Sequence, residues 1–545
     1  MQLLQLPILL FSLSFKKYSY MVRILLFSVL LTFSTVIRAQ DAYWQQDVDY
    51  TIDVTLNDQD NSLQGTSTVV YKNNSPESLN FIWFHLWPNA YKNENTALFQ
   101  QLKNDSSSKE DLSAIAYGYI DGLDFKVNGK KAKTEAHPNP AYIDIIKVVL
   151  PKALKPGESA TISTDFHVKL PSYFSRSGFA DGQFMIAQWY PKPAVFDKKG
   201  WHEFPYLSMG EYYSEYGNYK VTITLPGNYV VGATGTLQNK DELAQYKAIG
   251  SKNIADRTGT PVLYKGTQAT KTLSYIAENV PDFAWFAEKD VVIQYDTLQL
   301  KSGKVVDAFT YYKNKPETIW NNSIDYAKAA TRFYSNAIGE YEYPVVQVFE
   351  GPKNNSSGGM EYPMITLITV PDASKEYLDG VIAHEIGHNW FMSMLGSNER
   401  DHTWQDEGLN SYFQFRYEAE RGRYNSIFRD QIPPQMRELP LDQFQRATYY
   451  ALSQIPMNLI IDQPAAAFKT SDDYAIASYI KAALWVFQLE KKVGRDKVDA
   501  AFKAYFNEWS NKHPQPEDMK ASFEKSLGTN LDEWFGELKK EDPIK

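Results

Sequence analysis

The chain has 545 residues, of which 43% are hydrophobic and 22% are charged. This is an ordinary globular composition, and the length indicates about two to four domains. The formal net charge of −9 argues against nucleic acid as a partner. Cysteine is absent, which excludes disulfide bonds, a thiol nucleophile and sulfur ligands for a metal ion.

Residues 1–39 predict an export signal. A short basic segment ends at Arg23, residues 24–37 are apolar, and Ala39 precedes the polar start of a mature chain. The apolar run is short for a membrane span. We therefore expect cleavage after Ala39 and a periplasmic or secreted protein without stable membrane association. Residues 1–20 are interpreted as an extension upstream of the true start, and a retained N-terminal anchor is the alternative.

Residues 40–289 predict a mostly β region. Apolar side chains alternate along 50–56, a polar turn follows at 57–61, and the alternation returns along 63–71. This pattern indicates a long hairpin. Similar alternating runs, separated by turn residues, continue along this part of the chain.

Residues 290–545 predict a second, mainly helical region. A helix is expected over 316–338 and a strand over 345–350. Farther along, a helix over 378–395 carries two histidines, and an amphipathic helix is expected over 479–491.

The sequence HEIGH at residues 384–388 predicts a metal site. On a helix His384 and His388 lie on one face, about 40° apart at 3.6 residues per turn, so both imidazoles can bind one ion. Glu407 offers a carboxylate oxygen as a third ligand. Three protein ligands and one open position are typical of catalytic zinc, whereas structural zinc has four ligands. We therefore expect one Zn²⁺, the metal that imidazole and carboxylate donors with an open position favour.

Glu385 lies between the two histidines in the sequence and is expected to act as the general base. Zinc makes water more acidic, and Glu385 can accept a proton from the attacking water and pass it to the departing amine. Taken singly, each of these residues could be an ordinary helix residue that binds no metal. Taken together, they predict a metal-dependent hydrolase.

These residues resemble the motifs of the aminopeptidase N and leukotriene hydrolase family of zinc peptidases, which are gluzincins. That family places a glutamate eighteen intervening residues after the second histidine, as between His388 and Glu407. Its Gly-x-Met-Glu-Asn motif is matched at 358–362, except that Tyr362 replaces the final asparagine. The resemblance extends over most of the chain after the signal segment.

A further family motif, Tyr-x-Lys-Gly, is matched at 479–482, with Ala482 in place of glycine. The resemblance implies an α+β multidomain protein. A saddle-like β domain would precede a thermolysin-like, mainly helical catalytic domain, and no large C-terminal helical domain is expected. It also implies an aminopeptidase that hydrolyses N-terminal amino acids from peptides with a free N-terminus.

The resemblance assigns substrate contacts to several residues. Glu361 is expected to bind the substrate's α-ammonium group, because a carboxylate beside the metal attracts a cation. Gly358 and Gly359 belong to the same motif, and Met360 is expected to line the pocket for the first side chain. Gln188 is the expected counterpart of a family residue that lies beside the amine anchor.

Tyr479 is implied to donate a hydrogen bond to the oxyanion, since a phenol stays protonated at neutral pH. Tyr474, five residues earlier, is its nearest rival. Asp406 either orients a metal ligand or caps the following helix, and the sequence leaves both interpretations open.

Two alternatives belong to other functional classes. A non-catalytic binding protein could use the same fold, but such proteins usually lose the metal ligands and the base, which are present here. An epoxide hydrolase is the other alternative, because one fold can host several chemistries.

Overall fold

The computed structural model of the chain describes residues 43–108, 110–315, 318–355, 357–542 and 544. The predicted signal segment over 1–39 lies outside the described residues. Among the described residues, no helix combines the length and the apolar composition that a membrane span requires.

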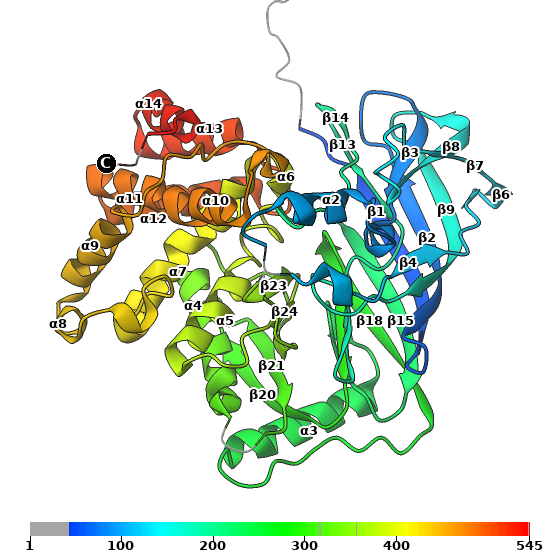
Figure 1. Ribbon diagram of the computed structural model, residues 1–545, viewed down its shortest axis with the longest axis horizontal. Coiled ribbons are helices and arrows are strands. Elements are labelled where there is room, and N and C mark those ends of the chain that lie inside the picture. The colour runs from blue at the N-terminus through cyan, green and yellow to red at the C-terminus, as the bar shows by residue number, and fades with distance from the viewer. Residues whose placement is uncertain (1–42, 109, 316–317, 356, 543, 545) are drawn as a thin grey trace, which may run out of the picture. The chain divides into compact units, whose positions relative to one another are not determined.

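The N-terminal region contains a large, mostly antiparallel sheet (Figure 1). Its strand order is β17-β18-β15-β1-β2-β9-β5-β6, and β4 pairs with β9. The hairpin predicted from the sequence is confirmed: β1 pairs with β2 from Asp47 opposite Lys72 to Asn57 opposite Ser62. Side chains of β1 alternate between exposed and buried, as in a sheet with one face on a core. The strands are β1 (Asp47–Asn57), β2 (Ser62–Lys72), β4 (Tyr119–Asp121), β5 (Lys126–Val127), β6 (Lys130–Lys131), β9 (Ser159–Lys169), β15 (Gly217–Pro226), β17 (Thr236–Leu237) and β18 (Thr270–Val280).

Smaller sheets complete this region. One has the order β10-β11-β19-β16, another the order β12-β3-β8-β7, and β13 pairs with β14. Their strands are β3 (Leu79–His85), β7 (Lys133–Ala136), β8 (Ile145–Leu154), β10 (Gly178–Ala180), β11 (Gln183–Ile186), β12 (Lys192–Pro193), β13 (Val195–Asp197), β14 (Gly200–His202), β16 (Val230–Ala233) and β19 (Trp285–Glu288).

In the described part of the β region, two α-helices lie between strands, and the sequence pattern did not predict them. They are α2 (Ala97–Asn104) and α3 (Lys240–Ala255). Helix α3 is rich in charged and polar residues and has Gly250 in its interior. Its buried residues are few, so its apolar periodicity is too weak to predict a helix.

A second sheet supports the predicted metal site. Its order is β20-β21-β22-β24-β23, with β20 (Val291–Gln299), β21 (Val305–Lys313), β22 (Val345–Glu350), β23 (Gly359–Tyr362) and β24 (Ile365–Ile368). Every residue of β22, β23 and β24 is buried, because helices pack on one face and the N-terminal region packs on the other. The N-terminal region lies close to this sheet, because a β-carbon added to Gly232 of β16 would be 2.9 Å from Cδ1 of Ile365 in β24. The expected boundary after residue 289 falls between β19 and β20.

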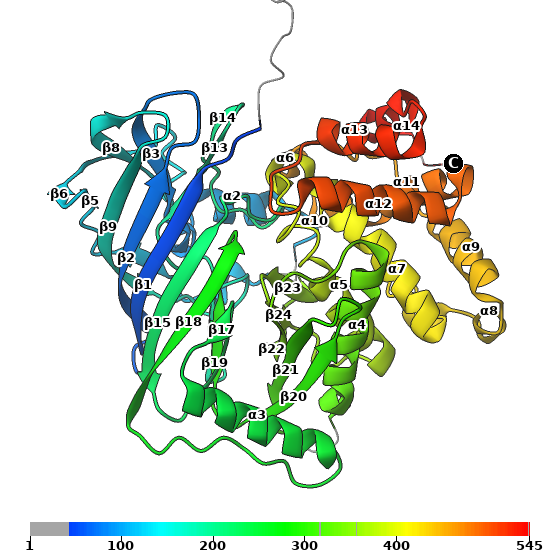
Figure 2. The ribbon, with the colours of Figure 1, turned by 180° about the vertical axis from the view of Figure 1, so that it is seen from behind.

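The C-terminal region is mainly helical (Figure 2), as predicted. Helices α4 and α5 lie beside the second sheet, α8 and α9 lie on the side away from the large sheet, and α6, α7 and α10 to α14 complete this region. Their bounds are α4 (Ser323–Ala337), α5 (Lys375–Gly387), α6 (Glu399–His402), α7 (Glu407–Gly422), α8 (Pro434–Arg437), α9 (Leu441–Leu452), α10 (Ser471–Ala475), α11 (Ala482–Val493), α12 (Arg495–Trp509), α13 (Pro516–Leu527) and α14 (Asp532–Gly536).

Two predicted helices have different boundaries in the structure. The helix predicted over 378–395 ends at Gly387, where His388 is the C-cap, and the chain then turns tightly with Met392 at φ 97°. The helix predicted over 479–491 begins earlier, and a π-helical turn at Ile476–Lys481 joins α10 to α11. A pattern of apolar residues does not distinguish these turns from regular helix.

Candidate metal centre and substrate cavity

A cavity of about 370 Å³ contains the predicted metal ligands. Its walls come from the N-terminal region at Arg176 and Glu211, from β23, from α5 and α7, and from the π-helical turn. Residues far apart in the sequence therefore converge on one site.

The side chains of His384, His388 and Glu407 converge on one point. The two Nε2 atoms are 3.1 Å apart, and Glu407 Oε2 lies 3.3 Å from His384 Nε2 and 3.4 Å from His388 Nε2. Ligands of a tetrahedral zinc ion at ordinary bond lengths are about 3.3–3.6 Å apart. Glu407 Oε2 is buried and has no hydrogen-bond partner among the described residues. The donor set and its spacing thus fit one zinc ion.

Hydrogen bonds on the far side of each imidazole orient both histidines. His384 Nδ1 donates to Gln414 Oε1 at 2.8 Å, and His388 Nδ1 donates to Asp406 Oδ1 at 2.6 Å. Such bonds fix the tautomer and aim Nε2 at the metal. Asp406 makes no side-chain cap to helix α7. Of the two interpretations left open by the sequence, the structure therefore supports ligand orientation.

Local packing explains the short helix that carries the histidines. The side chain of Ser374 caps α5 by accepting from Tyr377 N. A β-carbon on Gly387 would lie 2.0 Å from Asn410 Oδ1, so only glycine lets α5 approach α7 this closely. The close approach places Glu407, at the start of α7, beside the histidines of α5.

Glu385 lies in the same cavity and is 5% exposed. Burial, with a contribution from the negative charge of Glu407, raises the pKa of the Glu385 carboxyl to about 7. A group with such a pKa is well suited to accept and return a proton at neutral pH.

The hydroxyl of Tyr479 donates a hydrogen bond to Glu407 Oε1. Burial raises the pKa of Tyr479 well above its ordinary value, so the phenol remains a donor at neutral pH. Tyr474 lines the same cavity, and the two ring centroids are 6.0 Å apart. Its hydroxyl has no hydrogen-bond partner among the described residues. Tyr479 is therefore the tyrosine that hydrogen-bonds to a candidate metal ligand.

Glu361 lies on β23 beside the candidate metal ligands. Its carboxylate belongs to a buried group with His388, Asp406 and Glu407, whose potential ligand atoms all lie within 4.8 Å of one another. Burial raises the pKa of Glu361 well above its ordinary value, and the negative charges of Glu211 and Glu407 add to this rise. A cation bound here would relieve that repulsion.

The predicted glycine-rich segment also lines the cavity. Gly358, Gly359 and Met360 are all lining residues, and Met360 is 4% exposed. The structure thus brings together every site residue predicted from the sequence except Gln188.

Residues 323–537 match the model of the peptidase family M1 domain. This match lies in the mainly helical region and includes the two histidines and Glu407. Leucine aminopeptidase 2 of Chaetomium globosum is 26% identical over 187 residues, which are 34% of this chain and 29% of that protein. The chain therefore matches less than a third of the length of this curated relative.

Solved structures share the fold of the whole described chain. An M1 zinc metallopeptidase mutant from Deinococcus radiodurans, bound to a Tyr-Ser-Ala substrate, has a TM-score of 0.58 and 15% identity and covers 92% of this chain and 96% of its own. Aminopeptidase A of Legionella pneumophila, in complex with aspartic acid, has a TM-score of 0.61 and 15% identity, with coverage of 92% and 50%. These likenesses confirm the predicted α+β architecture, in which a β region precedes a mainly helical region.

The position of Gln188 does not support its predicted contact with the substrate amine. The side chain is 2% exposed and donates from Nε2 to Asp282 Oδ2 at 2.6 Å, within the N-terminal region. Gln188 also has φ 55° and is not among the residues that line the cavity around the candidate metal ligands. The hydrogen bond to Asp282 satisfies the buried amide nitrogen of Gln188.

Glu211, which the sequence pattern did not predict, lines the same cavity as Glu361. The charge of Glu211 affects the pKa of Glu361. Arg176 holds it through a bond from Nε to Oε2 of 2.9 Å and a second bond from Nη2 to Oε1. No local motif marks either residue, because they are 35 positions apart and meet only in the folded protein.

Proposed function

We propose that the protein is a zinc aminopeptidase that removes amino acids from the free N-terminus of peptides. The triangle of donor atoms from His384, His388 and Glu407, with two carboxylates on the neighbouring cavity wall, is the observation that carries this proposal. The similarity of the M1 domain to fungal leucine aminopeptidases supports the reaction class.

Glu361 and Glu211 would bind the substrate's α-ammonium group. Two carboxylates near one cation form charge-assisted hydrogen bonds, and burial strengthens them. Arg176 keeps Glu211 in a fixed orientation through its paired contacts. A blocked N-terminus would leave these buried carboxylates without a cationic partner, which explains why an exopeptidase would reject it.

Glu385 would act as the general base and Tyr479 as the oxyanion donor. A zinc ion held by the two histidines and Glu407 would polarise the scissile carbonyl and acidify water. Glu385 accepts the proton of the attacking water and then transfers it to the leaving amine. Tyr479 donates a hydrogen bond to the carbonyl oxygen as negative charge develops on it.

The test uses purified protein with substrates that differ only at the N-terminus. The protein should release p-nitroaniline from leucine p-nitroanilide, lose this activity with a chelator and regain it with zinc. N-acetyl-leucine p-nitroanilide should remain intact. Equal cleavage of the acetylated compound would show that no free amine is needed and would overturn the exopeptidase assignment.

We also propose that the protein is exported. The basic, apolar and small-residue sequence that ends at Ala39 supports this. N-terminal sequencing of the protein recovered from expressing cells should begin at Gln40. An N-terminus at or before Met21 in the mature protein would contradict it.

A further inference from the structure

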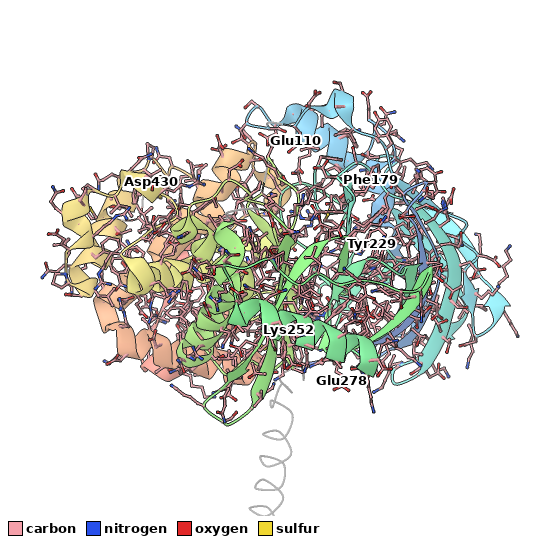
Figure 3. The ribbon with its side chains drawn as sticks, turned by 90° about the horizontal axis from the view of Figure 1, so that it is seen from below. Glu110, Phe179, Tyr229, Lys252, Glu278 and Asp430 are labelled. Atoms are coloured by element: carbon pink, nitrogen blue, oxygen red, sulfur yellow. The ribbon has the colours of Figure 1, made fainter. Side chains whose placement is uncertain are left out.

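The catalytic cavity continues into a second groove. This groove has a volume of about 460 Å³ and shares Asn354, Ser357, Gly358, Tyr377 and Arg429 with the cavity. Figure 3 labels Glu110, which lines the cavity, in the N-terminal region and Asp430, which lines the groove, in the helical region. A substrate longer than one residue would therefore have room beyond the reacting centre.

The strand that carries Glu361 gives the direction of the substrate. Glu361 lies at the His388 end of α5, whereas a β-carbon on Gly358 would lie 3.8 Å from the Tyr377 hydroxyl, near the start of that helix. If Glu361 holds the amine, as the proposed function requires, the rest of the peptide extends past His384 toward Tyr377. Tyr377 precedes His384 by seven residues, which is about 10 Å along a helix axis.

Arg429 is held at the junction of the cavity and the groove. Its guanidinium lies 3.9 Å from the centroid of the Tyr377 ring, and Nη2 donates to the Tyr377 hydroxyl at 2.7 Å. Nε donates to Ser426 O at 3.2 Å. Stacking and two hydrogen bonds fix an arginine that faces solvent, so little side-chain entropy remains to be lost when a ligand binds.

The charge of Arg429 has no acidic partner among the described residues, since no ion pair involves it. The other arginine of the cavity wall, Arg176, is paired with Glu211. The remaining acidic residues near the reacting centre repel anions. Within the described walls of the cavity and the groove, Arg429 is thus the arginine that can receive a ligand carboxylate.

We propose that Arg429 binds a carboxylate of the leaving peptide. An extended chain spans about 3.3–3.6 Å per residue, so about 10 Å corresponds to two or three residues beyond the scissile bond. The shared chemistry is a carboxylate, and its source is either the C-terminus of a tripeptide or tetrapeptide or an acidic side chain at that position. This subsite would favour short peptides over simple aminoacyl amides.

The experiment compares kcat/KM for Leu-Gly-Gly and Leu-Gly-Gly-Gly with their C-terminal amides. Each value is divided by that for leucine p-nitroanilide with the same enzyme, because the anilide has no carboxylate. In the wild-type protein, amidation should lower this ratio roughly tenfold, as expected for a lost hydrogen bond between charged groups. Absence of all hydrolysis, anilide included, would reject the proposed function and is distinct from an unchanged ratio.

Variants assign the effect to Arg429. In Arg429→Gln the free peptides should lose their advantage and amidation should have no further effect, while Arg429→Lys should keep part of it. The matched control is Arg437→Gln, which removes the same charge from an exposed site on α8 outside both walls. Amidation should still lower the ratio in this control. A wild-type ratio insensitive to amidation, or an equal loss in both variants, overturns the proposal.

A binding measurement tests the same contact without turnover. In the Glu385→Gln background, calorimetry with Leu-Gly-Gly should give a Kd roughly tenfold lower than with its amide, and adding Arg429→Gln should remove the difference. Leu-Gly-Asp-amide, whose carboxylate is on a side chain, distinguishes the two sources of the carboxylate. Restored binding assigns the subsite to acidic side chains, and failure to restore it assigns the subsite to the C-terminus. Equal Kd values for free acid, amide and aspartyl peptide overturn the proposal.

Discussion

Gly359 lies against the carboxylate of Glu385. A β-carbon at position 359 would be 2.6 Å from the carboxyl carbon of Glu385, which is too close for any real contact. At the neighbouring Gly358 the nearest heavy atom would be 3.7 Å away, an ordinary distance. Because residue 359 has no β-carbon, the carboxylate of Glu385 fits into the space beside it.

Gly359→Ala should impair the reaction by displacing Glu385. A shift of about 1 Å in a catalytic group can lower the rate about a hundredfold. We expect kcat for leucine p-nitroanilide to fall by that order, whereas Gly358→Ala should have a much smaller effect. Zinc content should stay near one per chain in both variants. If the two variants lose activity equally, crowding of Glu385 is not the cause.

Asp406→Ala should weaken metal binding without removing a metal ligand. Loss of the bond to His388 Nδ1 frees the imidazole to rotate, and such changes typically lower metal affinity about 10–100-fold. Competition with a chromophoric chelator measures the zinc Kd, and excess zinc should restore much of the activity. Unchanged zinc affinity would argue against the orienting role of this carboxylate.

Tyr479→Phe should lower kcat with little change in KM. Loss of one oxyanion donor typically costs about 10²–10³-fold in kcat. Tyr474→Phe removes a hydroxyl from the same cavity but from a ring that does not reach Glu407, so its loss should be much smaller. Steady-state kinetics of both variants decide the assignment, and the reverse order would make Tyr474 the donor.

Glu361→Gln and Glu211→Gln should each weaken recognition of the α-ammonium group. Each removes one hydrogen bond between charged groups, worth about 1.5–3 kcal/mol, so kcat/KM should fall roughly 10–150-fold. Gln188→Ala, outside the cavity, should not change the preference for free over acetylated N-termini. A loss of that preference in Gln188→Ala would restore the role first predicted for this residue.

Lys192→Met should destabilise the N-terminal region. Lys192 Nζ lies 2.6 Å from Asp282 Oδ1, and both side chains are buried, so the change leaves a buried charge that has lost its cation. Breaking such a pair costs about 3–5 kcal/mol of unfolding free energy. The exposed pair between Lys72 and Asp47 is the control, and Lys72→Met should cost at most about 1 kcal/mol. Urea denaturation followed by tryptophan fluorescence measures both.

The metal ligands could be predicted because their arrangement is mostly local. Helical spacing alone places His384 and His388 on one face, and Glu407 follows at a fixed distance in the sequence. Glu361 and Tyr479 required a family resemblance, since a glutamate after glycines and a tyrosine on a helix have no distinctive spacing.

The remaining contacts arise from tertiary structure. Arg176 and Glu211 come from irregular segments of the N-terminal region and reach the cavity only because that region packs on the second sheet. Their ion pair is invisible to a periodicity argument. Helix α3 was missed for another reason, because its polar sequence gives little indication of a buried face.

The π-helical turn determines how the tyrosines of the cavity are presented. In an α-helix, side chains five positions apart point about 140° away from each other, yet Tyr474 and Tyr479 line one cavity. The wider turn between them, with its longer hydrogen-bonded ring, brings them to the same side. The number of residues in this segment therefore matters more than their identity. Deleting one residue from Ile476–Ser478 would let the segment relax to a regular helix and rotate one phenol out of the site, whereas most single substitutions there would leave both in place.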